Sequence, residues 1–184
     1  PFAVVTTMSL SNDGYEDRPA SIGITSNGFL VVPRASDPGG VASVLASTLT
    51  RTNSLSFTGV VGASDAVECQ PDSNFCFVCT HRVPTYFAKL QVNSDGSMVQ
   101  LSGVSHSGVT LNYQMSSDAN YLYHLVGGTT TTLYLLDASD INTISSLTFP
   151  ANTGGTQSWK ADKWFVYVSC PSTSRTIRTA SSIS

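Results

Sequence analysis

A unit that repeats about every 46 residues constrains this chain more than any other feature of its sequence. Four segments share a polar turn followed by an apolar, aromatic run: SNGFLVV, DSNFCFV, DANYLYH and DKWFVYV. Their first residues, which are separated by 46, 46 and 44 positions, are Ser26, Asp72, Asp118 and Asp162. Bulky side chains alternate along the runs, which is the period of a β-strand. Each unit therefore contains a turn followed by a strand.

The flanks of these runs predict three further strands in each unit. A short strand precedes each turn, at 21–25, 66–70, 111–115 and 157–160. A third strand follows each run, at 41–47, 86–92, 133–137 and 176–180. A fourth strand closes the first three units, at 55–60, 98–104 and 144–149. Residues 1–10 form one more strand ahead of the first unit.

Four strands in about 45 residues is the size of a β-propeller blade. The sequence therefore predicts an all-β chain, folded as one propeller domain over residues 1–184, with blade repeats that start near 20, 66, 111 and 157. Sixteen strands are enough for four blades of four. We expect residues 1–10 to complete the last blade and close the ring, because closure removes unpaired sheet edges. The alternative is that these blades are part of a larger ring.

The composition excludes several functions. Charged residues make up 11% of the chain, against about 25% in a typical soluble domain, and the net charge is −3. A nucleic-acid interface needs a basic stripe, which this sequence lacks. Every apolar run is shorter than the ~20 residues of a spanning helix. A surface rich in Ser, Thr and Gly favours an extracellular or cell-surface protein.

The scarce charged residues gather at one end of the predicted ring. In a propeller, the loops from the second to the third strand and the loops between blades emerge at the same end, here called the loop face. Loops on a rigid scaffold often carry binding residues. The candidates for ligand binding at the loop face are His81, Arg82, His106, Asp65, Glu16, Asp17 and Arg34.

Some of these residues have the side chains used in acid–base or metal chemistry. His81, His106, Asp65 and Glu16 are of the right types. No spacing among them fixes a site, so no metal is assigned. No GxSxG, HExxH, P-loop or dinucleotide-binding motif occurs, so no catalytic residue or cofactor is assigned either. His124 falls within a strand and is expected to be an interior side chain.

Two cysteines are predicted to lie opposite each other. The turn of the second unit runs through 71–74, which places Cys69 opposite Cys76. Residues three apart in a strand point to opposite faces, so Cys76 and Cys79 are not expected to share a metal. If the protein is extracellular, we expect a Cys69–Cys76 disulfide. The alternative is a pair of free thiols packed as small apolar side chains.

The unit also resembles the repeat of lactonase-type (YVTN) propellers. Residues 118–139, DANYLYHLVGGTTTTLYLLDAS, look like segments of secreted fungal proteins related to 6-phosphogluconolactonase. The resemblance implies a propeller and, in members that use a metal, carboxylate and Asn ligands over the central channel. That family is seven-bladed, whereas this chain holds four blades at most. A second chain or copy that completes a larger ring is therefore an alternative to closure.

Two classes of function follow from the sequence. The first is a non-catalytic extracellular or structural module that binds a protein or glycan partner through the loop face. The alternative is a lactonase-like hydrolase with a metal or acid–base site over the central channel. A stoichiometric metal or an acidic pair over the channel would favour the enzyme.

Overall fold

The computed structural model describes residues 22–34, 39–58, 62–80, 85–106, 114–126, 131–149, 158–161, 165–169 and 174–178. Within these ranges there are fifteen β-strands and no helix, and hence no helix long and apolar enough to span a membrane. The strands form three four-stranded sheets and one three-stranded sheet. In each sheet, neighbours along the chain pair antiparallel, as expected for propeller blades.

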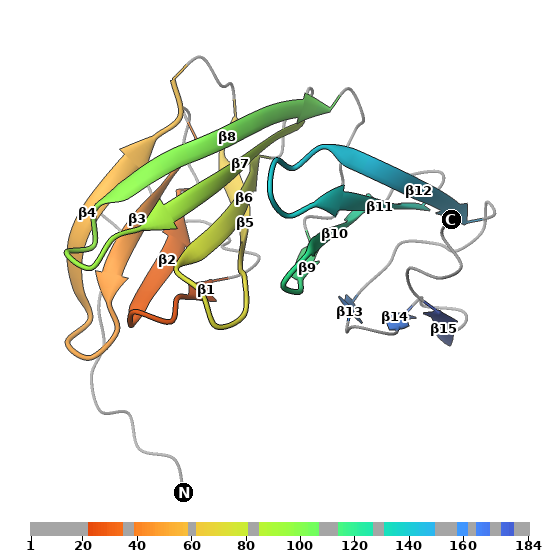
Figure 1. Cartoon of the computed structure of the whole chain (residues 1–184), viewed down its shortest axis with the longest axis horizontal. Coiled ribbons are helices and arrows are strands. Elements are labelled where there is room, and N and C mark those ends of the chain that lie inside the picture. The colour runs from red at the N-terminus through yellow and green to blue at the C-terminus, as the bar shows by residue number, and fades with distance from the viewer. Residues whose placement is uncertain are drawn as a thin grey trace, which may run out of the picture.

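The four sheets follow one another along the chain (Figure 1). The first blade contains β1 Gly23–Ile24, β2 Phe29–Pro33, β3 Gly40–Leu45 and β4 Thr50–Ser56. The second blade contains β5 Ser64–Cys69, β6 Phe75–Thr80, β7 Thr85–Val92 and β8 Met98–His106. The third blade contains β9 Gln114–Ser117, β10 Tyr121–Val126, β11 Thr131–Asp137 and β12 Thr143–Phe149. The fourth sheet contains β13 Ser158–Ala161, β14 Phe165–Ser169 and β15 Ser174–Arg178.

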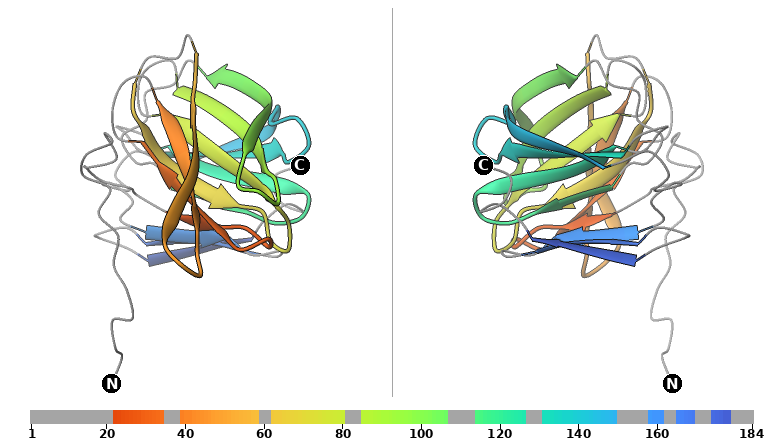
Figure 2. Two further views of the ribbon diagram at one scale, coloured as in Figure 1. Left: turned by 90° about the vertical axis from the view of Figure 1, so that its left-hand side faces the viewer. Right: turned by 90° about the vertical axis from the view of Figure 1, so that its right-hand side faces the viewer.

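The first strand of each blade lies against the first strand of the next. Strand β5 contacts both β1 and β9, and β9 contacts β13. Figure 2 (left) looks onto the first blade, with the second blade behind it. This arrangement, with the first strands innermost and each blade packed face to face on the next, is that of a propeller.

The 46-residue repeat is exact in the hydrogen bonding of the first three blades. In each of these blades a backbone N–H at the end of the third strand donates to a carbonyl in the turn between the first and second strands. Donor and acceptor both advance by 46 residues from blade to blade: Ala46 to Gly28 (3.0 Å), Val92 to Asn74 (2.9 Å) and Ala138 to Asn120 (2.9 Å). The pairing with the outer strand shifts register directly after Ser43, Lys89 and Leu135, which are also 46 apart. A β-bulge at an outer strand bends a sheet edge that would otherwise be open for pairing.

Two strand positions differ from the sequence prediction. The outer strand of the first blade is Thr50–Ser56 rather than 55–60, because nearly all its side chains are exposed and apolar patterning does not mark it. The first strand of the third blade, described from Gln114, continues to Ser117 rather than ending at 115. Its turn is tightened by Asp118, whose carboxylate accepts the N–H groups of Asn120 (2.7 Å) and Tyr121 (2.8 Å).

Residues 1–10 lie outside the described residues. Their predicted role, completing the last blade beside β15, stays a prediction. Within the described ranges the fourth sheet has three strands, β13, β14 and β15.

The second blade is buried on both faces. One face packs against the first blade in a cluster that includes Phe29, Val31 and Leu90. The other packs against the third blade in a cluster that includes Phe77 and Leu136. Burial on both sides explains why β6, FCFVCT, reads as a continuous apolar run rather than an alternating one.

The cysteine register is confirmed, but the disulfide is not formed. Cys69 pairs directly with Cys76 across β5 and β6. Cys69, Cys76 and Cys79 are all free thiols. Directly opposed residues have Cβ atoms about 4.5–5.5 Å apart, beyond the ~3.5–4.5 Å of a disulfide. Cys76 and Cys79 belong to the two different core clusters, as expected for opposite faces of one strand, and Cys170 lies outside the described residues.

We expect Cys76 to be protected and to make stability sensitive to alkali. The hydrogen bond with Cys69, and then burial, raise the pKa of the Cys76 thiol well above its ordinary value of 9.0. The unfolded chain therefore loses this proton first, so the stabilisation is complete below pH 9.0 and is lost as the pH rises above it. Native protein should alkylate at Cys76 about tenfold more slowly, or slower still, than protein in urea.

The measurements are mass-spectrometric labelling with iodoacetamide and melting temperatures at neutral and alkaline pH. The Cys76→Ala variant is the control, and its melting temperature should fall less on going to alkaline pH than that of the wild type. Fast native labelling at Cys76, or equal falls in the two proteins, would show that the thiol is neither buried nor shifted.

Candidate functional site

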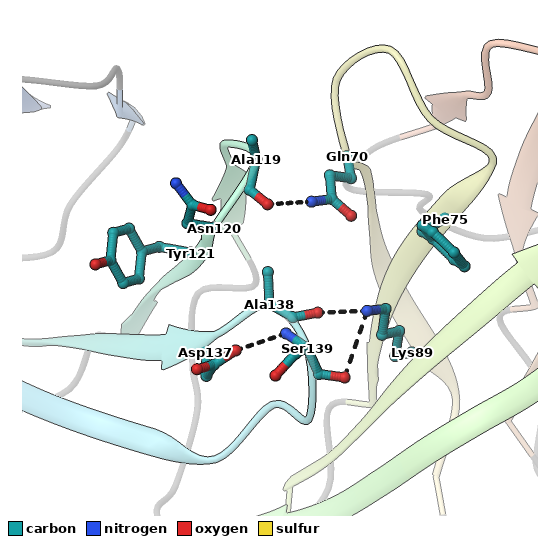
Figure 3. A pocket seen from close by; sticks show the side chains of 9 residues that line it. All are labelled: Gln70, Phe75, Lys89, Ala119, Asn120, Tyr121, Asp137, Ala138 and Ser139. Atoms are coloured by element: carbon teal, nitrogen blue, oxygen red, sulfur yellow. Dashed lines mark hydrogen bonds between the residues drawn. The ribbon is translucent and has the colours of Figure 1, made fainter.

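A pocket of about 440 Å³ opens between the second and third blades (Figure 3). It lies at the end of the blades opposite the loop face, among the turns that join first to second and third to fourth strands. This end is called the turn face below. The lining residues are Gln70, Phe75, Lys89, Ala119, Asn120, Tyr121, Asp137, Ala138 and Ser139. The volume is within the range of small-molecule sites.

Two aromatic residues in equivalent positions belong to the lining. Phe75 opens β6 in the second blade, and Tyr121 opens β10 in the third blade, one repeat later. Both side chains are half-buried. Successive side chains of a strand point to opposite faces, and Leu122 packs against the second blade, so the Tyr121 ring lies on the other face of the third blade, near Tyr123. Figure 3 shows the Tyr121 hydroxyl directed away from Phe75 and Gln70, so Phe75 supplies the aromatic side of the pocket.

Lys89 ties the two blades together at the base of the pocket. Its Nζ donates hydrogen bonds to the carbonyl oxygens of Ala138 (2.6 Å) and Ser139 (3.4 Å) in the third blade. The same ammonium lies 4.8 Å from the ring centroid of Phe75 and 6.0 Å from that of Phe77. Contact between a cation and aromatic faces adds to the hydrogen bonds.

The length of the Lys89 side chain explains why a pocket exists here. One repeat earlier the equivalent residue is Ser43, whose short side chain donates to the carbonyl oxygen of Gly96 (2.6 Å). A Cβ on Gly96 would collide with Thr52 and Phe29, so that turn lies tight against the first blade. Lys89 makes the corresponding bond through a four-carbon stem. The turn of the third blade is therefore held further from β7, and the space between becomes the pocket.

The pocket holds one cation and one anion. Burial lowers the pKa of Lys89, and the nearby carboxylates of Asp137 and Asp140 partly oppose that shift. Hydrogen bonds from the side chain and N–H of Ser139 lower the pKa of Asp137, with a smaller contribution from Lys89. The N–H of Ser139 lies 2.7 Å from the Asp137 carboxylate. Asp137 is therefore ionised at neutral pH, and the charges of the lining nearly balance.

Several polar groups in the lining are available to a ligand. Gln70 uses its Nε2 to donate to the carbonyl of Ala119 (2.6 Å), a second bond between the blades. Within the described ranges, the Gln70 side-chain oxygen and the Asn120 side-chain amide have no hydrogen-bond partner in the protein. The site thus offers a donor and acceptors beside the Phe75 ring.

The structure describes few of the residues predicted at the loop face. Glu16, Asp17, His81 and Arg82 lie outside the described residues. Asp65 and His106 were expected in interblade loops, but they belong to strands, because β5 begins at Ser64 and β8 continues to His106. The paired residues Ser64–Thr80 and Thr85–His106 nevertheless place both at the end of the blade where β6 ends and β7 begins.

Arg34 is the predicted loop-face residue whose side chain is described. Its backbone N–H donates to Gly40 (2.8 Å) and its carbonyl accepts from Ser64 (2.8 Å), which joins the first blade to the second. Its guanidinium donates to the hydroxyl of Ser56 (3.2 Å). Among the described residues, the hydrogen bonds of Arg34 therefore serve to hold the first blade together and to join it to the second.

His124 is an interior residue, as predicted. It is 2% exposed, between the second and third blades. Its ring meets Phe87 edge-on at 4.6 Å and stacks near Tyr134 at 6.4 Å.

Sequence reasoning missed the pocket because it looked for charge in loops. The signal was present in the repeat: positions 43, 89 and 135 hold Ser, Lys and Leu. Because the other two blades have a buried Ser or Leu at this position, a lysine here indicates that a longer side chain makes the contact between the second and third blades. Among the described residues, no group of three or more His, Cys, Asp or Glu could hold a metal ion.

Comparison with solved structures bears on the fold. A protein from Lactobacillus plantarum is 15% identical, with a TM-score of 0.68 over 90% of this chain and 52% of that one. BamB from Moraxella catarrhalis is 14% identical, with a TM-score of 0.54 over 82% and 46%. A chain of the Mitotic Checkpoint Complex is 14% identical, with a TM-score of 0.59 over 85% and 44%. The latter two are β-propeller-type proteins.

This chain folds as a β-propeller. Its blades are the antiparallel four-stranded sheets described above. It spans about half the length of the neighbours it matches. No protein-family model and no curated protein matches the sequence. At this level of identity the likeness shows the fold alone.

Proposed function

We propose that the chain is a non-catalytic, extracellular β-propeller module that binds a protein or glycan partner at its turn face. The observation that carries the proposal is the pocket between the second and third blades, with its available polar groups and the ring of Phe75. Ligand sites are commonly concave, with a few polar groups that fix orientation. The low content of charged residues supports the extracellular location, whereas the free thiols of Cys69 and Cys76 do not add support, because a disulfide was expected there.

The propeller-type neighbours support a binding role. One of them is a component of a named complex, the Mitotic Checkpoint Complex. A propeller presents turns from several blades at one end, so a partner can contact more than one blade at once. In this chain the turn face brings residues of two blades to one pocket.

The test compares the two ends of the ring. The protein is screened against a glycan array and a panel of extracellular protein domains, and each hit is measured again with two double variants. We expect Asn120→Ala with Ser139→Ala to weaken binding at least tenfold, because both exposed side chains line the pocket. We expect His81→Ala with His106→Ala, at the loop face predicted from sequence, to bind as the wild type does.

The opposite pattern would move the site to the loop face and contradict the proposal. Hits that neither pair affects would also contradict it. The Asn53→Ala variant is the matched control, because Asn53 is exposed on β4 of the first blade and far along the chain from the pocket. Turnover of a lactone by the purified protein would contradict the non-catalytic part.

We also propose that a second copy of the chain completes a larger ring. Gly23 faces Cys69 and Val67 of the second blade, so its neighbours in the chain face away from that blade. Those neighbours, Ile22 and Ile24, are 52% and 62% exposed. Their exposure on an innermost strand supports an unfilled blade-to-blade contact.

Sedimentation velocity tests this second proposal. We expect a dimer in the wild type and a monomer in the Ile22→Lys, Ile24→Lys double variant, because a charge buried in the contact is costly. Val99→Lys, on the exposed edge strand β8, is the control and should leave the dimer intact. A wild-type monomer at every concentration would contradict the proposal.

A further inference from the structure

We propose that the pocket between the second and third blades binds a neutral sugar ring. The inference rests on the proposed function for the claim that the pocket is a binding site, and goes beyond it by naming the ligand class. Three properties of the lining carry it: its charge balance, its hydrogen-bonding groups and the ring of Phe75.

The charge balance favours a neutral ligand. The Lys89 ammonium is already engaged with the carbonyl oxygens of Ala138 and Ser139, at 2.6 and 3.4 Å. The Asp137 carboxylate lies in the same lining and accepts the N–H of Ser139. An anion entering the pocket would be repelled by the Asp137 carboxylate, and a cation would be repelled by the Lys89 ammonium. A ligand without net charge avoids both repulsions.

The available polar groups suit hydroxyl groups, each of which donates and accepts. The side-chain oxygen of Gln70 accepts, and the side-chain amide of Asn120 both donates and accepts. The second oxygen of Asp137 adds an acceptor. These groups come from two blades and belong to the lining of one pocket (Figure 3). Adjacent hydroxyls of a sugar can pair with such a mixed set without leaving a buried donor or acceptor unmet.

Phe75 suits the other property of a sugar, its apolar C–H surface. Its side chain is half-buried, so part of the ring is accessible. Aromatic side chains combine a large apolar area with restricted freedom. A ligand that is polar around its edge and apolar on one face fits a site with amides and a carboxylate beside one aromatic ring.

A protein segment fits this pocket less well. Protein interfaces draw most of their affinity from large side chains that enter fully desolvated apolar sockets. Here most of the lining residues are polar or small, and the ring that faces the pocket, Phe75, has the Lys89 ammonium beside it. A protein partner at this pocket is therefore the competing outcome of the test.

The test is a titration of the ¹⁵N-labelled full chain, followed by NMR. The probes are glucose, galactose, mannose and N-acetylglucosamine, with glucuronate and glucosamine as charged analogues. We expect at least one neutral sugar to shift the backbone amides of residues 119–121 and 138–139 and the side-chain amides of Gln70 and Asn120. The charged analogue of the sugar that binds should bind at least tenfold more weakly.

Two variants check the assignment. Phe75→Ala and Asn120→Ala should each weaken binding of that sugar at least tenfold, whereas Asn53→Ala should leave it unchanged. Because Phe75 is half-buried, Asn120→Ala, at an exposed position, keeps the test valid if Phe75→Ala does not fold. Absence of shifts with every sugar, shifts elsewhere in the chain, or equal binding of charged analogues would overturn the inference.

The result also separates the two proposals. If a protein partner binds, and its binding is lost in the Asn120→Ala, Ser139→Ala variant while no sugar binds, the sugar assignment is wrong and the proposed function stands. If no ligand of either class depends on the pocket, both are wrong.

Discussion

Phe77→Ala is expected to lower the free energy of unfolding by about 3–5 kcal/mol, which is the usual cost of deleting a buried Phe ring. Phe77 is 0% exposed and lies in the cluster that joins the second blade to the third. Its neighbours include Phe87 and Leu136, which come from different blades. The sheets on both sides are held by their own hydrogen bonds, so they cannot collapse into the space left behind.

Urea denaturation followed by tryptophan fluorescence measures the change. Val99→Ala is the control, because Val99 is 49% exposed on β8 and its truncation should change stability by about 0.5 kcal/mol or less. A loss below about 1 kcal/mol for Phe77→Ala would mean that the second and third blades do not pack through this face.

Lys89→Ala is expected to cost about 2 kcal/mol, as for the loss of a hydrogen bond to a charged group. The carbonyl of Ala138 would lose its donor at 2.6 Å, and Phe75 would lose the ammonium over its ring. Burial lowers the pKa of Lys89, so part of the loss is offset when the desolvated charge is removed.

Ser43→Ala is the matched variant one repeat earlier. It removes a neutral hydrogen bond to Gly96, so we expect a cost of about 1 kcal/mol. The same urea titrations give both values. If Lys89→Ala proved as stable as the wild type, Lys89 would not tie the blades together, and the explanation of the pocket would be wrong.

The architecture was predictable because the repeat is carried by turns and aromatic residues. The turn at 71–74 placed Cys69 opposite Cys76, and the structure has that pair. The polar strand Thr50–Ser56 was misplaced because exposed outer strands leave no apolar pattern. The tight turn at Asp118 shifted another strand, because side-chain bonds to the backbone can shorten a turn.

The site was much less predictable than the fold. Charge in loops pointed to residues such as His81 and Arg82, which lie outside the described residues. The pocket instead depends on which blade-to-blade contact is made by a long side chain, Lys89 rather than Ser43. That difference acts between elements far apart in the sequence. Only the assembled blades show that it opens a space.

Site-specific photo-crosslinking tests the central claim, binding at the turn face, most directly. A benzophenone amino acid is placed at Asn120 in one protein and at Arg82 in another, and each is irradiated with the partner found in the array or panel screen. The account predicts a crosslink from position 120, beside the pocket, and none from position 82, which the sequence predicts at the loop face. A crosslink from position 82 alone would contradict it.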